Sequence, residues 1–233
     1  MISLAFFLTT LFPSSTPPRS AREVARAIDA HYHHAQTLRA TFYERYSDGN
    51  GAVSAESGTV YFSKPGRMRW EYESPEQKLF IVDGANAWFY VPADRTASRA
   101  KVAESSDWRT PLAFLAGKTD LARLCQTMVI VDSAKAQGAN PEDRATGGEN
   151  TVLRCAPRYN AGDPDEQIRE VLLEVDPDAR LVRVVIRQPG KLETEFRFAN
   201  WQENLSIPET KFHFDPPSGV AIVDESALAG ALH

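Results

Sequence analysis

Polar and bulky apolar side chains alternate without a break over residues 67–73 of the chain. Because successive side chains of a β-strand point to opposite faces, the pattern predicts a strand with one polar and one apolar face. The polar face carries Arg67, Arg69, Glu71 and Glu73, and the apolar face carries Met68, Trp70 and Tyr72. We expect the polar face to meet water and the aromatic face to line either a core or a ligand site.

Comparable runs of β-branched and aromatic residues recur along the chain, separated by turn-forming residues. They predict about eleven antiparallel strands, because the chain shows no βαβ rhythm. The DGNG run at 48–51 and Gly84 mark two of the turns. The expected strands cover residues 41–47, 56–63, 67–73, 77–83, 86–92, 126–132, 150–156, 168–176, 180–187 and 192–200, with a weaker strand at 95–102.

Two segments have helical spacing instead. Ser20 and Glu23 form a capping-box pattern, which predicts a helix that begins there and runs to about residue 36. This helix has a narrow apolar stripe formed by Val24, Ile28 and Tyr32. Residues 107–125 predict one or two short helices, with Leu112, Leu115, Leu121 and Leu124 at helical spacing and Gly117 at a helix end.

A sheet with this many twisted strands must curl, and the apolar faces of the helices must be buried somewhere. An open, incomplete antiparallel β-barrel with an α-helical lid on its concave face satisfies both requirements. The fold class is therefore mainly β. The length of 233 residues suits one domain, which we place at residues 21–233.

Residues 1–20 differ from the rest of the chain. Ile2–Phe12 is an apolar run that is too short to span a bilayer and is typical of an export signal, with residues 13–20 as a flexible leader. No basic residue precedes the run and no A-x-A cleavage site follows it, so an uncleaved anchor or a plain tail stays open as an alternative. An export signal predicts a periplasmic protein.

Charge and motifs exclude several classes of function. The net charge of −5, without a basic stripe, argues against nucleic acid as a partner. The chain contains no G-x-S-x-G, H-E-x-x-H or P-loop motif, so we expect no enzyme and no cofactor. The only histidine cluster, HYHH at 31–34, favours an exposed helix end over a metal site.

The two cysteines, Cys125 and Cys155, each lie in a strand-like run. If those runs pair as antiparallel neighbours, an export context would allow a disulfide between them. Two reduced, buried thiols are the alternative.

Aromatic residues are in excess on the predicted strands. An ordinary core would account for them, and a cavity for acyl chains is the sharper hypothesis. The candidate cavity residues are Val24, Ile28, Tyr32, Phe42, Phe62, Met68, Trp70, Tyr72, Phe80, Trp88, Tyr90, Leu112, Leu115, Phe196 and Phe198.

Several motifs in order resemble the outer-membrane lipoprotein carrier protein LolA family. The run at 57–92 has Gly58, Lys64-Pro65, Trp70 with Tyr72, Asp83-Gly84 and the pattern W-x-Y-x-P at 88–92. LRATFYER at 38–45, TPLAFLAG at 110–117 and KFHFDPPSGVAIVD at 211–224 match the family's first strand, lid helix and carboxyl-terminal signature. The resemblance spans about residues 21–224.

The resemblance implies the same half-barrel fold and a role without catalysis. The protein would take triacylated lipoproteins from an inner-membrane ABC exporter, shield their acyl chains as a monomer and carry them towards the outer membrane. Whether a separate outer-membrane acceptor exists stays open. A periplasmic lipid-binding sensor or regulator with the same fold is the alternative function.

The resemblance also implies a lid latch. In the family an arginine before the proline holds the empty lid shut through hydrogen bonds to the first helix, and Lys64 occupies that position here. Lysine lacks the planar fork of arginine, and the facing helix position is Tyr32, where aliphatic residues are common. An ordinary exposed turn lysine is the alternative for Lys64.

Overall fold

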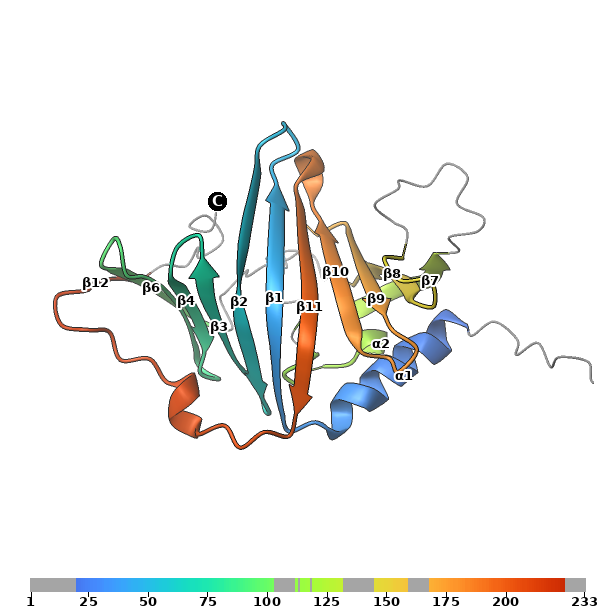
Figure 1. Ribbon diagram of the computed structural model, residues 1–233, viewed down its shortest axis with the longest axis horizontal. Helices are drawn as coiled ribbons and strands as arrows, with labels where there is room; N and C mark the ends of the chain where they lie inside the picture. The colour runs from blue at the N-terminus through green and yellow to red at the C-terminus, as the bar shows by residue number, and fades with distance from the viewer. Residues whose placement is uncertain are drawn as a thin grey trace, which may run out of the picture.

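The computed structural model describes residues 20–102, 112, 114–117, 119–131, 145–158 and 168–224 (Figure 1). Among these residues, none of the helices combines the length and the apolar character that a membrane-spanning helix needs. The predicted export signal and leader at 1–20 lie outside the described residues, apart from Ser20.

One twelve-stranded sheet forms the body of the protein, in the order β12-β6-β5-β4-β3-β2-β1-β11-β10-β9-β8-β7. The two ends of this order, β12 and β7, are not paired with each other, so the barrel is open. The strands are β1 Thr37–Ser47, β2 Val53–Ser63, β3 Arg67–Ser74, β4 Lys78–Val82, β5 Asn86–Val91, β6 Thr96–Lys101, β7 Cys125–Val131, β8 Thr151–Pro157, β9 Glu170–Val175, β10 Leu181–Arg187, β11 Glu193–Glu203 and β12 Ala221–Asp224.

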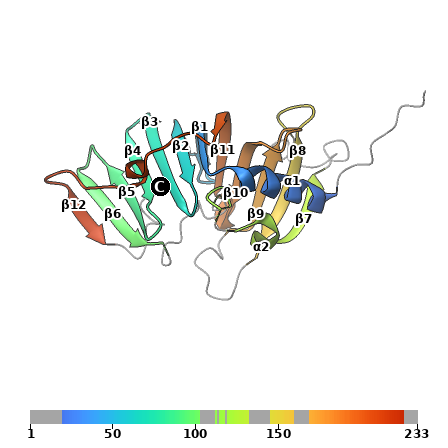
Figure 2. The same ribbon diagram turned by 90° about the horizontal axis from the view of Figure 1, so that it is seen from below.

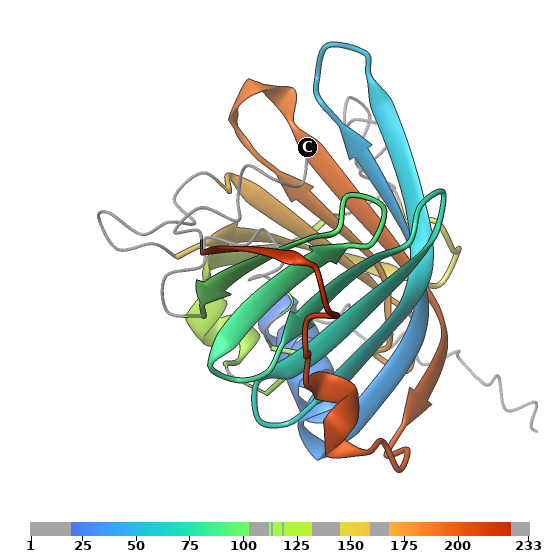
Figure 3. The same cartoon turned by 90° about the vertical axis from the view of Figure 1, so that its left-hand side faces the viewer.

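The mainly β, open fold class is confirmed, with one strand more than expected. Every pair of neighbouring strands among β1 to β11 is antiparallel, whereas β12 pairs with β6 in parallel. Sequence reasoning missed β12 because it has only four residues and all of them are exposed. The chain reaches it after crossing the outer side of the sheet from the end of β11 (Figure 3).

Helix α1, Ala21–His34, is the main cover of the sheet. Its capping box is confirmed, with the Ser20 side chain accepting from the Glu23 amide and the Glu23 carboxylate accepting from the Ser20 amide. The helix lies along the half of the sheet formed by β7 to β10 (Figure 2). We call the side of the sheet that α1 covers the inner face; Figure 3 shows the sheet curling towards it.

The segment predicted to hold one or two short helices is only partly described. Residues 103–111, 113 and 118 lie outside the described residues. Phe114 to Gly117 form a turn, and one turn of helix, α2, follows at Leu121–Leu124. Two short 3-10 helices complete the described elements, η4 at Pro189–Lys191 and η5 at Glu209–Phe212.

The outer face of β3 is less open to water than its pattern predicts. The Arg69 guanidinium donates to the Lys211 carbonyl at 3.0 Å, and the Lys211 ammonium lies 2.7 Å from the Glu71 carboxylate. Because these contacts bring η5 over the strand, Arg67, Arg69 and Glu71 are half-buried, and only Glu73 is exposed. The alternation set the two faces correctly, but a distant segment covers the polar one.

Candidate functional site

Six aromatic rings from five strands form one surface on the inner face, which we call the aromatic wall: Phe42, Phe62, Trp70, Phe80, Phe196 and Phe198. The strand register gathers them, because Phe42 lies opposite Phe198 and Trp70 lies opposite Phe80. Trp70 is fully buried at the centre, with ring centroids 4.8 Å from Phe42 and 5.4 Å from Phe196. The wall is therefore a continuous apolar surface.

Helix α1 lies beside the wall and reaches it through Trp201, whose ring packs on Tyr32 of α1 at 5.7 Å and on Phe198 of the wall at 5.4 Å. The turn at 114–117 is buried in the same interior. The structure places all of the predicted cavity residues except Trp88 and Tyr90 in one hydrophobic cluster with the wall, namely Val24, Ile28, Tyr32, Phe42, Phe62, Met68, Trp70, Tyr72, Phe80, Leu112, Leu115, Phe196 and Phe198. All of them are buried. In this state the apolar face of the lid is packed directly against the apolar interior of the sheet.

The placement of Trp88 and Tyr90 in this cavity was wrong. In β5 it is Phe89 that belongs to the inner cluster, while Trp88 and Tyr90 lie on the outer face against Phe214, with ring centroids 5.4 and 5.3 Å away. Three consecutive aromatic residues give no alternation, so the sequence pattern could not choose the face. The carboxyl-terminal segment supplies the outer cover that makes an aromatic residue stable there.

Sequence reasoning also missed residues of the inner cluster. Leu38 and Phe89 are buried there, and Phe114 packs edge-on against Tyr32 at 6.0 Å. Trp201 packs on Tyr32 at 5.7 Å and lies just beyond the predicted end of its strand. The parity of Leu38 with Phe42 was the one signal that could have found a member of this group.

Lys64 contacts the carboxyl end of α1. Its ammonium donates to the carbonyl oxygens of Tyr32 at 2.6 Å and of His33 at 2.8 Å. The last carbonyls of a helix lack intrahelical partners and carry the negative end of the helix dipole, so they suit a cation. Burial lowers the pKa of the Lys64 ammonium. Lys64 therefore makes contacts with the first helix of the kind that the resemblance implies, and its role as a latch stays a prediction.

Gly117 fits the turn at 114–117 against the Lys64 side chain. A Cβ at Gly117 would lie 2.8 Å from the Lys64 Cδ, and the φ of Gly117 is +73°. Both the close approach and the left-handed backbone favour glycine. The Gly66 amide also donates to the Ala116 carbonyl at 2.8 Å, so the turn and the lysine are held together.

Tyr32 fixes α1 to the sheet with its side chain as well as its carbonyl. The Leu181 amide, at the start of β10, donates to the Tyr32 hydroxyl oxygen at 2.7 Å. The Leu181 carbonyl accepts from the Trp201 indole at 2.7 Å. Burial raises the pKa of the Tyr32 hydroxyl far above its usual value, so this group stays neutral. An aliphatic residue at position 32 could not make this bond.

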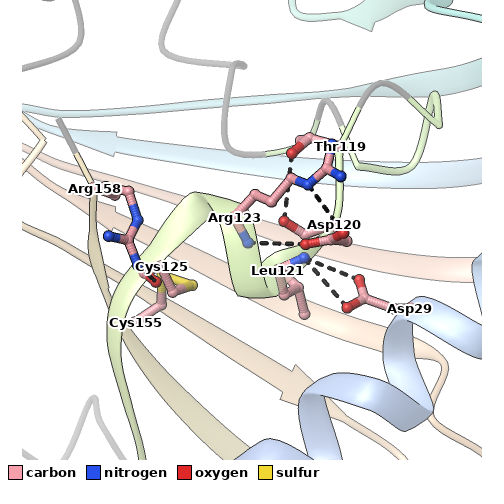
Figure 4. The surroundings of a disulfide bond; sticks show 8 residues. All are labelled: Asp29, Thr119, Asp120, Leu121, Arg123, Cys125, Cys155 and Arg158. Atoms are coloured by element: carbon pink, nitrogen blue, oxygen red, sulfur yellow. Dashed lines mark hydrogen bonds and ion pairs between the residues drawn. A yellow bond between two sulfur atoms is a disulfide. The ribbon is translucent and has the colours of Figure 1, made fainter. Parts of the chain in front are cut away.

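The region around α2 connects the lid to the β7 edge (Figure 4). The Asp29 carboxylate of α1 accepts from the Leu121 amide at 3.0 Å. Directly after α2, Cys125 is joined to Cys155 by a disulfide, with the sulfur atoms 2.04 Å apart. Of the two alternatives for the cysteines, the structure has the disulfide. It links the edge strand β7 to β8.

A polar cavity of about 630 Å³ borders the aromatic wall near the β1–β2 hairpin. The Tyr72 hydroxyl donates to the Glu44 carboxylate at 3.0 Å, and Lys78 pairs with Glu56. The Tyr72 ring packs on Phe42 at 5.1 Å, while its hydroxyl bonds to a side chain that lines the polar cavity. The apolar interior therefore ends at Tyr72 on this side. In the described part of the chain, no group of three or more His, Cys, Asp and Glu residues is placed to hold a metal ion.

Comparison with known proteins agrees with these features. The profile of the family described as "Outer membrane lipoprotein carrier protein LolA" matches residues 33–215. An outer-membrane lipoprotein carrier protein of Nitrosospira multiformis is 27% identical over 223 residues, covering 94% of this chain and 95% of the relative. One of Dechloromonas aromatica is 26% identical, covering 82% of each chain.

Among solved structures, an uncharacterised conserved protein from Thermus thermophilus is similar with a TM-score of 0.51 and 13% sequence identity. The match covers 88% of this chain and 99% of that protein. At this level of identity the likeness concerns the fold alone.

Proposed function

Because the chain belongs to the outer membrane lipoprotein carrier protein LolA family, we propose that it is a periplasmic carrier for lipoproteins. The observation that supports this most directly is the aromatic wall, which is buried in one apolar interior with an amphipathic helix whose carboxyl end Lys64 contacts. The wall would receive the acyl chains once α1 moves away. No covalent step is needed, and we infer no enzymatic activity.

The physical problem of the cargo explains the need for such a site. Each acyl CH₂ that leaves water gains about 0.8 kcal/mol, so a triacylated protein does not cross an aqueous space unshielded. A carrier must also release its cargo. A lid that packs well on the empty wall competes with the acyl chains and lowers their apparent affinity, because the open state is only a minor population.

The partners follow from this role. We infer that the cargo is a triacylated lipoprotein, delivered by an inner-membrane lipoprotein-releasing ABC transporter and passed on at the outer membrane. The protein would act as a monomer made of one domain at residues 21–233, in the periplasm, after export directed by the apolar run at 2–12.

Replacing Lys64 tests the proposal through the latch. Lys64→Met removes two charge-assisted hydrogen bonds from α1. A hydrogen bond to a charged group contributes about 1.5–3 kcal/mol net, and solvent screening at this half-buried site favours the lower end for the pair, so we expect the variant to bind a fluorescent triacylated lipopeptide about tenfold more tightly. Fluorescence anisotropy with detergent-free protein measures the dissociation constant.

Two variants control for effects other than the latch. Lys64→Arg keeps a cation and should bind like the wild type. Lys191→Met removes an exposed lysine at the end of η4 and should bind like the wild type. If the wild type and Lys64→Met both failed to bind the lipopeptide while remaining folded, the carrier proposal would be wrong. The result would then favour the alternative function as a sensor.

A further inference from the structure

His31 lies in the last turn of α1 and contacts the carboxyl end of β11. Its Nε2 atom is 2.9 Å from the Glu203 carboxylate, and the two side chains are 19% and 32% exposed. Among the described residues this nitrogen has no hydrogen-bond partner, so its approach to Glu203 is not aligned as a hydrogen bond. The contact therefore depends on charge, and the charge of an imidazole changes between about pH 5 and 8.

Glu203 belongs to the sheet and not to the lid. It is the last residue of β11. The next residue, Asn204, donates from its amide to the Thr37 carbonyl at 2.8 Å, and its side chain accepts from the Gln36 amide at 2.9 Å. The carboxylate is thus held at the edge of β1, whereas His31 would move with α1. Opening the lid therefore separates this pair.

Two turns bring further charges close to this contact. Asp176 and Arg180, on the turn between β9 and β10, act on the neighbouring Tyr32 hydroxyl with opposite signs, so their effects offset each other. The Lys64 ammonium lies on carbonyls at the end of α1 and repels a protonated imidazole. The Glu203 carboxylate is in direct contact with the imidazole, so its attraction is the largest of these effects, because Coulomb energy falls with distance.

We propose that His31 and Glu203 make the closing of the lid depend on pH. When His31 is protonated, the closed state has an ion pair that the open state lacks, and when His31 is neutral this difference disappears. Lower pH therefore favours the closed lid and weakens the binding of cargo, because binding requires the open state. The inference rests on the proposed carrier function and adds to it a condition that favours release.

The dissociation constant of a triacylated lipopeptide, measured at pH 7.5 and at pH 5.5, tests this proposal. Beyond its acylated cysteine the peptide contains only serine and lysine with an amidated carboxyl end, so the probe keeps its charge over this range. A partly exposed ion pair contributes little, so the wild type should bind about threefold more weakly at pH 5.5. Glu203→Gln removes the partner and His31→Gln removes the titrating group, so each should lose this difference.

His213 provides a matched control. It lies 3.1 Å from Asp215 in an exposed pair on the segment that crosses the outer side of the sheet, so His213→Gln should keep the threefold difference. Burial raises the pKa of Asp29 on α1, but this group is present in every variant and its titration is common to all of them. If His31→Gln and Glu203→Gln kept the pH difference of the wild type, the proposal would be overturned and the carrier function would stand.

Urea denaturation tests the contact without any cargo. Glu203→Gln should lower the free energy of unfolding more at pH 5.5 than at pH 7.5, because only the protonated imidazole loses an attraction. A loss that is equal at both pH values would overturn the contact itself. If the loss depended on pH but the wild type bound no lipopeptide at either pH, the carrier function would fail and the charge contact would stand.

Discussion

Replacing Arg183 by methionine should destabilise the fold by about 3–5 kcal/mol, which is usual when a buried ion pair loses one partner. The Arg183 guanidinium lies 2.7 Å from the Glu174 carboxylate, and both side chains are at most 5% exposed. The Glu174 carboxylate also accepts from Thr146 and from Asn150. It would remain buried and charged, which is the costly state. Urea denaturation at pH 7 measures the loss.

The pH dependence of this loss identifies its cause. Burial raises the pKa of the Glu174 carboxyl, but hydrogen bonds from Asn150, Thr146 and Arg183 outweigh it and hold the pKa below the usual value. Without Arg183 this pKa rises, so the deficit should be largest at neutral pH and shrink as the pH falls and Glu174 takes up a proton.

A surface arginine provides the control for Arg183. Arg180 lies 3.3 Å from Asp178, and their side chains are 48% and 71% exposed. Arg180→Met should therefore change stability by at most about 1 kcal/mol. Equal effects of Arg183→Met and Arg180→Met would show that the buried pair is not the cause.

Trp70→Ala should lower the free energy of unfolding by about 3–5 kcal/mol, as large-to-small changes in a core do. Trp70 is fully buried, and its ring contacts Phe42, Phe196 and Phe198. The change leaves an apolar cavity in the aromatic wall, and such cavities bind apolar ligands. A triacylated lipopeptide should therefore raise the melting temperature of this variant more than that of the wild type.

Trp88→Ala is the matched control, because Trp88 packs on the outer face against Phe214. This variant should also lose stability, but the lipopeptide should raise its melting temperature only as much as that of the wild type. If Trp70→Ala and Trp88→Ala responded equally to the lipopeptide, the aromatic wall would not be the acyl site.

Local patterns predicted much of the fold. The strict alternation at 67–73 set the faces of β3, and Ser20 with Glu23 set the start of α1. Residue spacing also placed Phe42, Trp70 and Phe196 on one face, because inward parity along a strand is a local property.

What the sequence did not predict depends on contacts between distant segments. Trp88 lies on the outer face because Phe214, far along the chain, covers it. The bond from the Leu181 amide to the Tyr32 hydroxyl joins residues 149 positions apart, and the buried pair of Glu174 with Arg183 requires the register of β9 and β10. Periodicity carries no information on such pairings.

We propose that the aromatic wall holds the acyl chains of lipoproteins. The direct measurement is denaturing mass spectrometry of material extracted from the wild type and from Lys64→Met, each secreted into a bacterial periplasm and purified without detergent. We expect triacylated lipoprotein on both proteins, with more on Lys64→Met. Folded proteins that carry only phospholipid, or nothing on either variant, would contradict it.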